Sequence, residues 1–137
     1  MSTAFSWPVR VYYEDTDSGG VVFYANYLKF FERARTEWLR SLGLESSALL
    51  AQYGALFVVK ASNVEYHASA RLDDELHVSS AVEKTGRASV VFYQEVRCGE
   101  RLMTSAHITV CWVDQKSWRP VAVPLPVLEL IRPAAVV

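Results

Sequence analysis

The stretch that decides the fold is residues 24–42, YANYLKFFERARTEWLRSL. When successive residues are placed about 100° apart, as in an α-helix, the bulky apolar residues fall on one side and form a stripe. The stripe comprises Tyr27, Phe30, Phe31, Ala34, Trp38 and Leu42, and the opposite side is polar, with Lys29, Glu32, Arg33, Thr36 and Arg40. Gly43 follows where a glycine commonly ends a helix. The pattern predicts an amphipathic helix of about five turns, whose aromatic face needs a large apolar surface to cover it.

The rest of the chain has the alternating patterns that are typical of β-strands. Strands are predicted at residues 9–13, 56–66, 75–83, 90–97 and 107–113, with Gly86 and Gly99-Glu100 as hairpin connections between the last three. A short helix is expected at 46–52, and the apolar tail 120–137 is expected to hold an edge strand, a helix at 125–131 and a frayed end. A curved antiparallel sheet would cover the long helix, so the predicted fold class is α+β.

Composition limits the function classes. The 137 residues fit one domain, 1–137, and 14 basic against 15 acidic residues give a net charge of −1, which argues against nucleic-acid binding. Cys98 and Cys111 make no disulfide framework and indicate a reducing compartment. The N-terminus lacks the features of a signal peptide, and no apolar run approaches the ~20 residues needed to span a bilayer. We therefore expect a soluble, cytoplasmic protein.

Acidic residues and two glycines immediately precede the helix, in residues 13–27, YEDTDSGGVVFYANY. A carboxylate held near a helix N-terminus places a base or nucleophile beside amides that can bind an oxyanion, and this pairing suits acyl transfer. Asp17 is one candidate carboxylate beside Glu14 and Asp15, although aspartate is also common in ordinary turns and at N-caps. Gly19 and Gly20 would allow close backbone approach to a substrate.

Other chemistries find little support in the sequence. His67, His77 and His107 have no metal-ligand spacing, so neither a metal nor a bound cofactor is expected. The chain has no Gly-x-Ser-x-Gly elbow, and Gly19-Gly20 belongs to no phosphate-binding or dinucleotide motif. Glu32 and Arg35 are expected to form a structural ion pair, either across the helix or at a subunit contact.

These residues resemble a known family. Residues 11–22, then 25–27, 31–35 and 64–74 are similar to hotdog-fold acyl-CoA thioesterases of the 4-hydroxybenzoyl-CoA thioesterase superfamily, in the Tol-Pal-associated, YbgC-like branch. The resemblance implies a sheet wrapped around the long central helix, and dimers or tetramers with acyl-CoA bound between subunits. It also implies a catalytic role for Asp17 and a backbone N–H near Tyr24 that polarises the thioester carbonyl.

The expected substrate contacts extend beyond the loop. They are Gly19, Gly20, Val21 and Val22 in the loop, Val59 in the acyl pocket, and Arg71 and Arg87 for the coenzyme A phosphates. The predicted reaction is hydrolysis of a short-chain or aromatic acyl-CoA to free acid and coenzyme A. Asp17 would act either as a nucleophile or as a general base.

The chain departs from the family pattern at two positions. Tyr24 stands where many relatives carry histidine, and Ser69 stands where proline is frequent. The tyrosine keeps open an alternative, a non-catalytic adaptor of an envelope-associated complex that binds acyl-CoA or acyl carrier protein. Dehydratase or isomerase chemistry is a weaker alternative, since it usually requires a histidine near the acyl chain.

Overall fold

The computed structural model describes residues 5–132 of the chain. Five strands and three α-helices follow one another, with two short 3₁₀ turns, Tyr13–Asp15 and Tyr24–Asn26, before the first helix. The elements are β1 Phe5–Arg10, α1 Tyr27–Ser41, α2 Ser46–Tyr53, β2 Ala55–Tyr66, β3 Glu75–Thr85, β4 Ser89–Cys98, β5 Arg101–Asp114 and α3 Leu125–Ile131.

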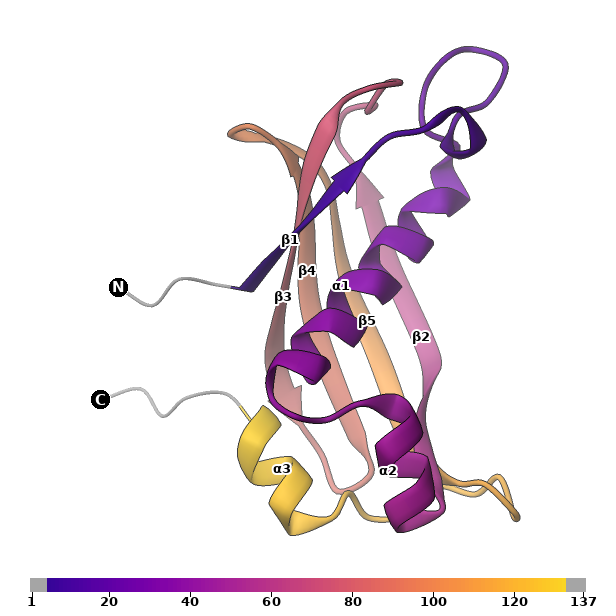
Figure 1. The fold of residues 1–137 in the computed structure, drawn as a ribbon, viewed down its shortest axis with the longest axis vertical. Coiled ribbons are helices and arrows are strands. Elements are labelled where there is room, and N and C mark those ends of the chain that lie inside the picture. The colour runs from indigo at the N-terminus through magenta and orange to yellow at the C-terminus, as the bar shows by residue number, and fades with distance from the viewer. Residues whose placement is uncertain (1–4, 133–137) are drawn as a thin grey trace.

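The strands form one antiparallel sheet in the order β1-β3-β4-β5-β2. The predicted meander is confirmed for β3, β4 and β5, whose connections are hairpins. β2 instead crosses to the far side of β5 and becomes an edge strand. Helix α1 lies across one face of the sheet, with α2 and α3 at its lower end (Figure 1). The predicted α+β class, with a sheet wrapped around one long helix, is confirmed.

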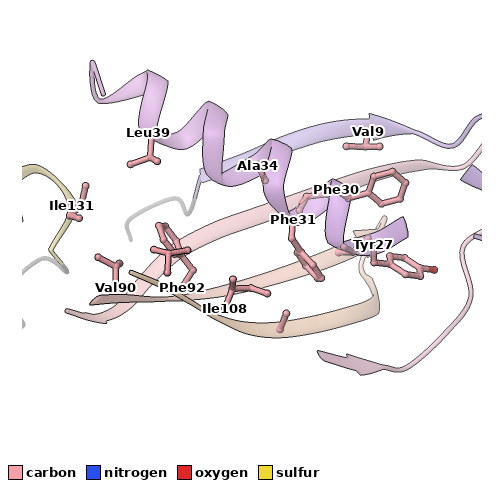
Figure 2. Packing of buried hydrophobic residues seen from close by; sticks show 14 of the residues in the cluster. Val9, Tyr27, Phe30, Phe31, Ala34, Leu39, Val90, Phe92, Ile108 and Ile131 are labelled. Atoms are coloured by element: carbon pink, nitrogen blue, oxygen red, sulfur yellow. The ribbon is translucent and has the colours of Figure 1, made fainter. Parts of the chain in front are cut away.

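The core lies between α1 and the inner face of the sheet. Phe30, Phe31 and Ala34 are fully buried there, opposite Phe92 and Ile108 (Figure 2). Burying such side chains stabilises the fold by roughly 1.5–3 kcal/mol for each large residue. The apolar stripe therefore does what its spacing predicts and fixes α1 against the strands.

The predicted long helix ends as expected but begins later. Gly43 has a φ of +80°, and the Leu44 N–H donates to the Leu39 carbonyl at 2.9 Å, which closes the C-terminus of α1. At the other end, residues 24–26 form a separate 3₁₀ turn, and α1 begins only at Tyr27.

Two further expectations at the chain's ends need correction. The first strand covers Phe5–Arg10 rather than residues 9–13, because the chain enters a 3₁₀ turn at Tyr13. In the tail, the helix at Leu125–Ile131 is confirmed, but the expected edge strand is a single bridge between Pro120 and Val113. The start of the chain, residues 1–4, and the expected frayed end, residues 133–137, lie outside the described residues.

Candidate active site

The segment between β1 and α1 is a closed loop. The Asp17 N–H donates to the Val21 carbonyl at 2.9 Å, and Thr16 and Val22 form an antiparallel bridge. One step further, the Phe23 N–H donates to the Asp15 carbonyl at 2.9 Å. These contacts place Asp17 on one leg of the loop and the chain that leads into Tyr24 on the other.

Asp17 lies at the tip of this loop and is exposed in the single chain. Its Oδ1 atom accepts a hydrogen bond from the Gly19 N–H at 2.8 Å. A Cβ atom on residue 19 would lie 3.2 Å from that oxygen, and Gly20 has a φ of +81°. The two glycines therefore allow the tight turn that orients the carboxylate, and the second oxygen stays available for chemistry.

The backbone amides predicted to bind an oxyanion lie in the 3₁₀ turn at Tyr24–Asn26. Within residues 5–132, the N–H groups of Tyr24 and Ala25 donate to no other group. The Tyr24 side chain is 64% exposed. The backbone carbonyl of Tyr24 accepts a hydrogen bond from the Tyr66 hydroxyl at 3.1 Å. The turn therefore presents free donors, and a tyrosine from the end of β2 holds it.

A buried polar pair under the loop was missed by the sequence analysis. Asp15 and Asn26 are only 5% and 7% exposed, and the Asn26 Nδ2 atom donates to Asp15 Oδ1 at 2.8 Å. The Tyr12 N–H donates to the other carboxylate oxygen at 2.9 Å. A lone Asp and a lone Asn, 11 residues apart, carry no periodic signal in the sequence.

The loop rests on the segment before β3. The Val22 N–H donates to the Ala70 carbonyl at 2.8 Å, and Val21 forms a bridge with Arg71. Arg71 therefore adjoins Val21 and Val22 of the Asp17 loop. Arg87 lies in the β3–β4 connection, at the opposite end of the sheet from this loop (Figure 1). One chain thus does not bring Arg71 and Arg87 together.

A cavity of about 310 Å³ opens between α1, α2 and β2. Its walls are largely apolar and include Leu39, Leu50, Phe57 and Val59, so the predicted pocket residue Val59 does line a cavity. On α1, the lining residues run from Glu32 to Leu39. The cavity therefore lies along the C-terminal half of α1, whereas Asp17 precedes the N-terminus of the helix.

Arg35 also lines this cavity and is 92% buried, being only 8% exposed. The predicted ion pair with Glu32 does not form within one chain: among residues 5–132 no salt bridge joins the two side chains. Instead, Arg35 donates to Gln94 Oε1 at 2.9 Å, and Gln94 in turn donates to the Phe31 carbonyl at 3.0 Å. Burial lowers the pKa of Arg35, because desolvation disfavours the charged form.

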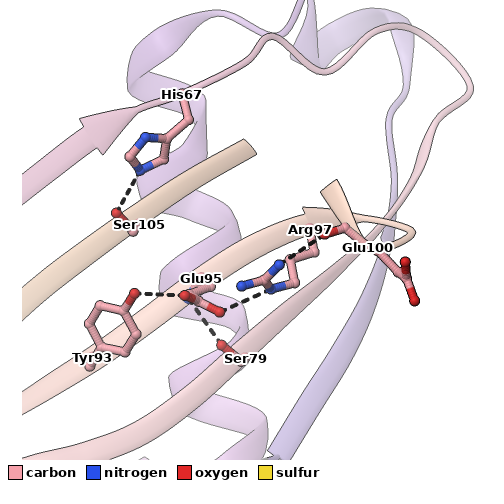
Figure 3. Close-up of polar contacts among 7 residues, drawn as sticks. All are labelled: His67, Ser79, Tyr93, Glu95, Arg97, Glu100 and Ser105. Carbon is pink, nitrogen blue, oxygen red and sulfur yellow. Dashed lines mark hydrogen bonds and ion pairs between the residues drawn. The ribbon is translucent and has the colours of Figure 1, made fainter. Parts of the chain in front are cut away.

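The outer face of the sheet carries a separate polar network (Figure 3). The Tyr93 hydroxyl donates to Glu95 at 2.6 Å and Arg97 Nε donates to it at 3.0 Å. The hydrogen bond to Glu95 raises the pKa of Tyr93 to about 12. Partial burial acts to raise the pKa of Glu95, but the bonds from Tyr93 and Arg97 outweigh it and the pKa is lowered. Strand alternation directs these side chains away from α1 and the cavity.

Within residues 5–132, no group of three or more His, Cys, Asp or Glu side chains is placed to hold a metal ion. None of the helices in that range combines the length and apolar character needed to cross a bilayer.

Comparisons with known proteins agree with this geometry. The profile of the Thioesterase superfamily matches residues 19–105. The chain is 44% identical over 124 residues to the acyl-CoA thioesterase YbgC of Haemophilus influenzae, covering 90% of this chain and 91% of the relative. It is 47% identical over 124 residues to the acyl-CoA thioester hydrolase YbgC of Escherichia coli O6:H1, covering 90% and 92%.

Solved structures give the same result for the fold. A probable thioesterase from Bartonella henselae matches with a TM-score of 0.85 and 28% identity, covering 89% of this chain and 100% of that chain. The sheet order, the single long helix and the loop before it define a hotdog-fold protein. The chain belongs to the thioesterase superfamily.

Proposed function

We infer that this protein is an enzyme that hydrolyses acyl-CoA thioesters to a free acid and coenzyme A. The observation that carries the inference is a carboxylate on a fixed turn, joined through a closed loop to a turn with free backbone amides. Relatives that match about nine-tenths of the chain bear the names acyl-CoA thioesterase and acyl-CoA thioester hydrolase. Family and geometry thus support the same reaction.

Two balanced routes use the Asp17 carboxylate. As a nucleophile, it attacks the thioester carbonyl and expels the coenzyme A thiolate, which takes up a proton, and water then hydrolyses the mixed anhydride. As a general base, it removes a proton from a water molecule that attacks the carbonyl directly; the tetrahedral intermediate then collapses, the C–S bond breaks, and the coenzyme A thiolate takes up the proton held by Asp17. In both routes the Tyr24 N–H donates to the carbonyl oxygen as it becomes negative.

We propose that two copies of the chain complete the site. α1 rises about 1.5 Å per residue, so the cavity beside Arg35 and Leu39 is displaced from Tyr24 by roughly 16–22 Å along the helix. β2 pairs only with β5 among the described strands, so its 12 residues form an open edge. A second copy that paired antiparallel with this edge would reverse its own α1 and bring its cavity toward Asp17.

The size of the cavity favours a small acyl group. Its volume of about 310 Å³ is at the small end of the ~300–1,000 Å³ usual for ligand pockets, which fits a short-chain or aromatic acyl group. Arg71, which adjoins the loop, is the first candidate for a coenzyme A phosphate contact. Arg87 would reach the same ligand only from a different subunit.

Thiol release from a panel of acyl-CoAs tests the function. We expect turnover by wild type and by Glu14→Gln, an exposed carboxylate in the same loop, and a loss of at least about 1,000-fold in kcat for Asp17→Asn. Equal rates for Asp17→Asn and wild type would remove Asp17 from the mechanism. Stable binding of acyl-CoA or acyl carrier protein without turnover of any thioester would favour the adaptor alternative.

Several finer features stay predictions. They are the assembly into dimers or tetramers, the cytoplasmic location, the association with the Tol-Pal system and the use of acyl carrier protein as the thiol. Light scattering of the purified protein would measure the first directly.

A further inference from the structure

We propose that Asp15 and Asn26 are positioning residues that set the Asp17 carboxylate against the Tyr24 and Ala25 amides. The proposal rests on the function inferred above, because it concerns the alignment of that site. Neither side chain is expected to touch the substrate, since both are more than nine-tenths buried.

The contacts around Asp15 tie the two legs of the loop together. Its side chain holds the Tyr12 N–H on the incoming leg and the Asn26 amide at the start of α1. Its backbone carbonyl holds the Phe23 N–H. The bonds to residues 23 and 26 bracket Tyr24 and Ala25, the two residues whose amides are free.

The same residue also lies close to Asp17 along the chain. Asp15 is two residues before it, and the Asp17 N–H is already fixed to the Val21 carbonyl at 2.9 Å. The Asp17 carboxylate and the Tyr24 and Ala25 amides are therefore both positioned relative to one buried residue, Asp15. Misplacing a reacting group by about 1 Å can cost on the order of 100-fold in rate, so this positioning matters for catalysis.

Stability alone accounts poorly for a carboxylate at this place. Among residues 5–132, Asp15 has no salt-bridge partner, and its oxygens accept only from the neutral donors at Tyr12 and Asn26. A buried charge without a cation is costly, even when it is hydrogen-bonded. Asp15 instead orients the loop, because its two carboxylate oxygens hold two separate segments in place at once.

A reciprocal exchange of the two side chains tests the proposal. Asn26→Asp places two carboxylates at the present 2.8 Å contact and should separate the two legs. We expect kcat to fall about 100-fold with KM changed less than about threefold, because the loop is displaced while the cavity is not. Adding Asp15→Asn restores a donor–acceptor pair with reversed roles and should recover kcat to within about tenfold of wild type.

Gln115→Glu is the matched control, an amide-to-acid change at an exposed residue of the turn after β5. It should keep wild-type kcat. Amide hydrogen exchange over residues 13–26 gives a readout independent of turnover: exchange should accelerate in Asn26→Asp and slow again in the double variant. Urea unfolding shows which variants are folded.

The outcomes separate the two proposals. No hydrolysis by wild type or by Gln115→Glu would refute the inferred function. With active wild type, a folded Asn26→Asp protein that kept wild-type kcat and exchange would refute the positioning role. A double variant that regained urea stability but neither kcat nor slow exchange would also refute it, and would leave the pair a purely structural role.

Discussion

The two ends of α1 differ in almost every physical respect. The N-terminal end is polar and tightly tied: a closed loop presents an exposed Asp17 and free amides over a buried Asp15–Asn26 pair. The C-terminal half lines an apolar cavity with a buried arginine at its wall. The N-terminal end has Asp17 and free amides beside an open hollow of about 220 Å³ lined by Tyr24, Tyr27 and Tyr66, and the C-terminal half has the larger apolar cavity of about 310 Å³ but not that carboxylate. This difference supports the proposal that two copies of the chain complete each site.

Apart from the changes at Asp17 and Asn26 given above, filling the cavity should produce the largest effect. Leu50→Trp adds bulk at the α2 wall of a cavity of about 310 Å³, so the acyl group should no longer fit. We expect kcat/KM to fall about 100-fold for the best acyl-CoA, by loss of the acyl contacts and of correct alignment. Steady-state thiol release measures this.

Two observations complete that test. Leu50→Ala, which enlarges the cavity instead, should move the preference toward longer acyl chains. Unchanged chain-length profiles for both variants would show that acyl groups bind elsewhere.

At the N-terminal end, removing one hydroxyl should give a smaller effect. Tyr66→Phe deletes the 3.1 Å hydrogen bond to the Tyr24 carbonyl, which is part of the peptide that carries the Ala25 N–H. Since the bond is exposed, we expect kcat to fall about fivefold with KM little changed. Tyr53→Phe, a ring far from the loop on α2, is the control and should leave kcat unchanged.

Away from both ends of α1, a change on the outer face of the sheet should alter stability but not activity. Glu95 has a lowered pKa in the folded state, so its stabilising effect is present above the unfolded value of 4.5 and is lost as pH falls through the folded value. We expect Glu95→Gln to lower the unfolding free energy by about 1 kcal/mol or less at pH 7, and by progressively less below pH ~4.5. Urea unfolding at several pH values measures the difference.

The same variant also checks the separation between this face and the site. Glu100→Gln, in the exposed turn after β4, should unfold like wild type at every pH. A Glu95→Gln protein with altered kcat would contradict the separation.

The sequence predicted local elements well, because their patterns are periodic. The stripe from Phe30 to Ala34 and the glycine at position 43 correctly located the body and end of α1. It could not predict that β2 crosses to the far edge, since strand order depends on contacts distant in sequence. The 3₁₀ turn at Tyr24–Asn26 also escaped prediction, because the helical pattern of side chains continues through it.

Individual polar residues were the least predictable part of the site. Arg35 was expected to pair with Glu32, yet it is buried against Gln94, 59 residues away. The role of Asp15 depends on Asn26 across the loop, and its neighbour Asp17 has the same composition signal but is exposed. Resemblance to a family singled out Asp17, and the three-dimensional contacts added that Asp15 is buried and hydrogen-bonded to Asn26.

Mixed oligomers test most directly whether the two ends of α1 from different copies form one site. Asp17→Asn and Leu50→Trp proteins, each nearly inactive alone, are unfolded together, refolded as a 1:1 mixture and assayed for thiol release. In a mixed dimer, the intact Asp17 of one copy would face the open cavity of the other. The predicted result is recovery of about a quarter of wild-type activity, because half of the dimers are mixed and each has one intact site. A mixture that assembles but stays as inactive as its parents would contradict the account.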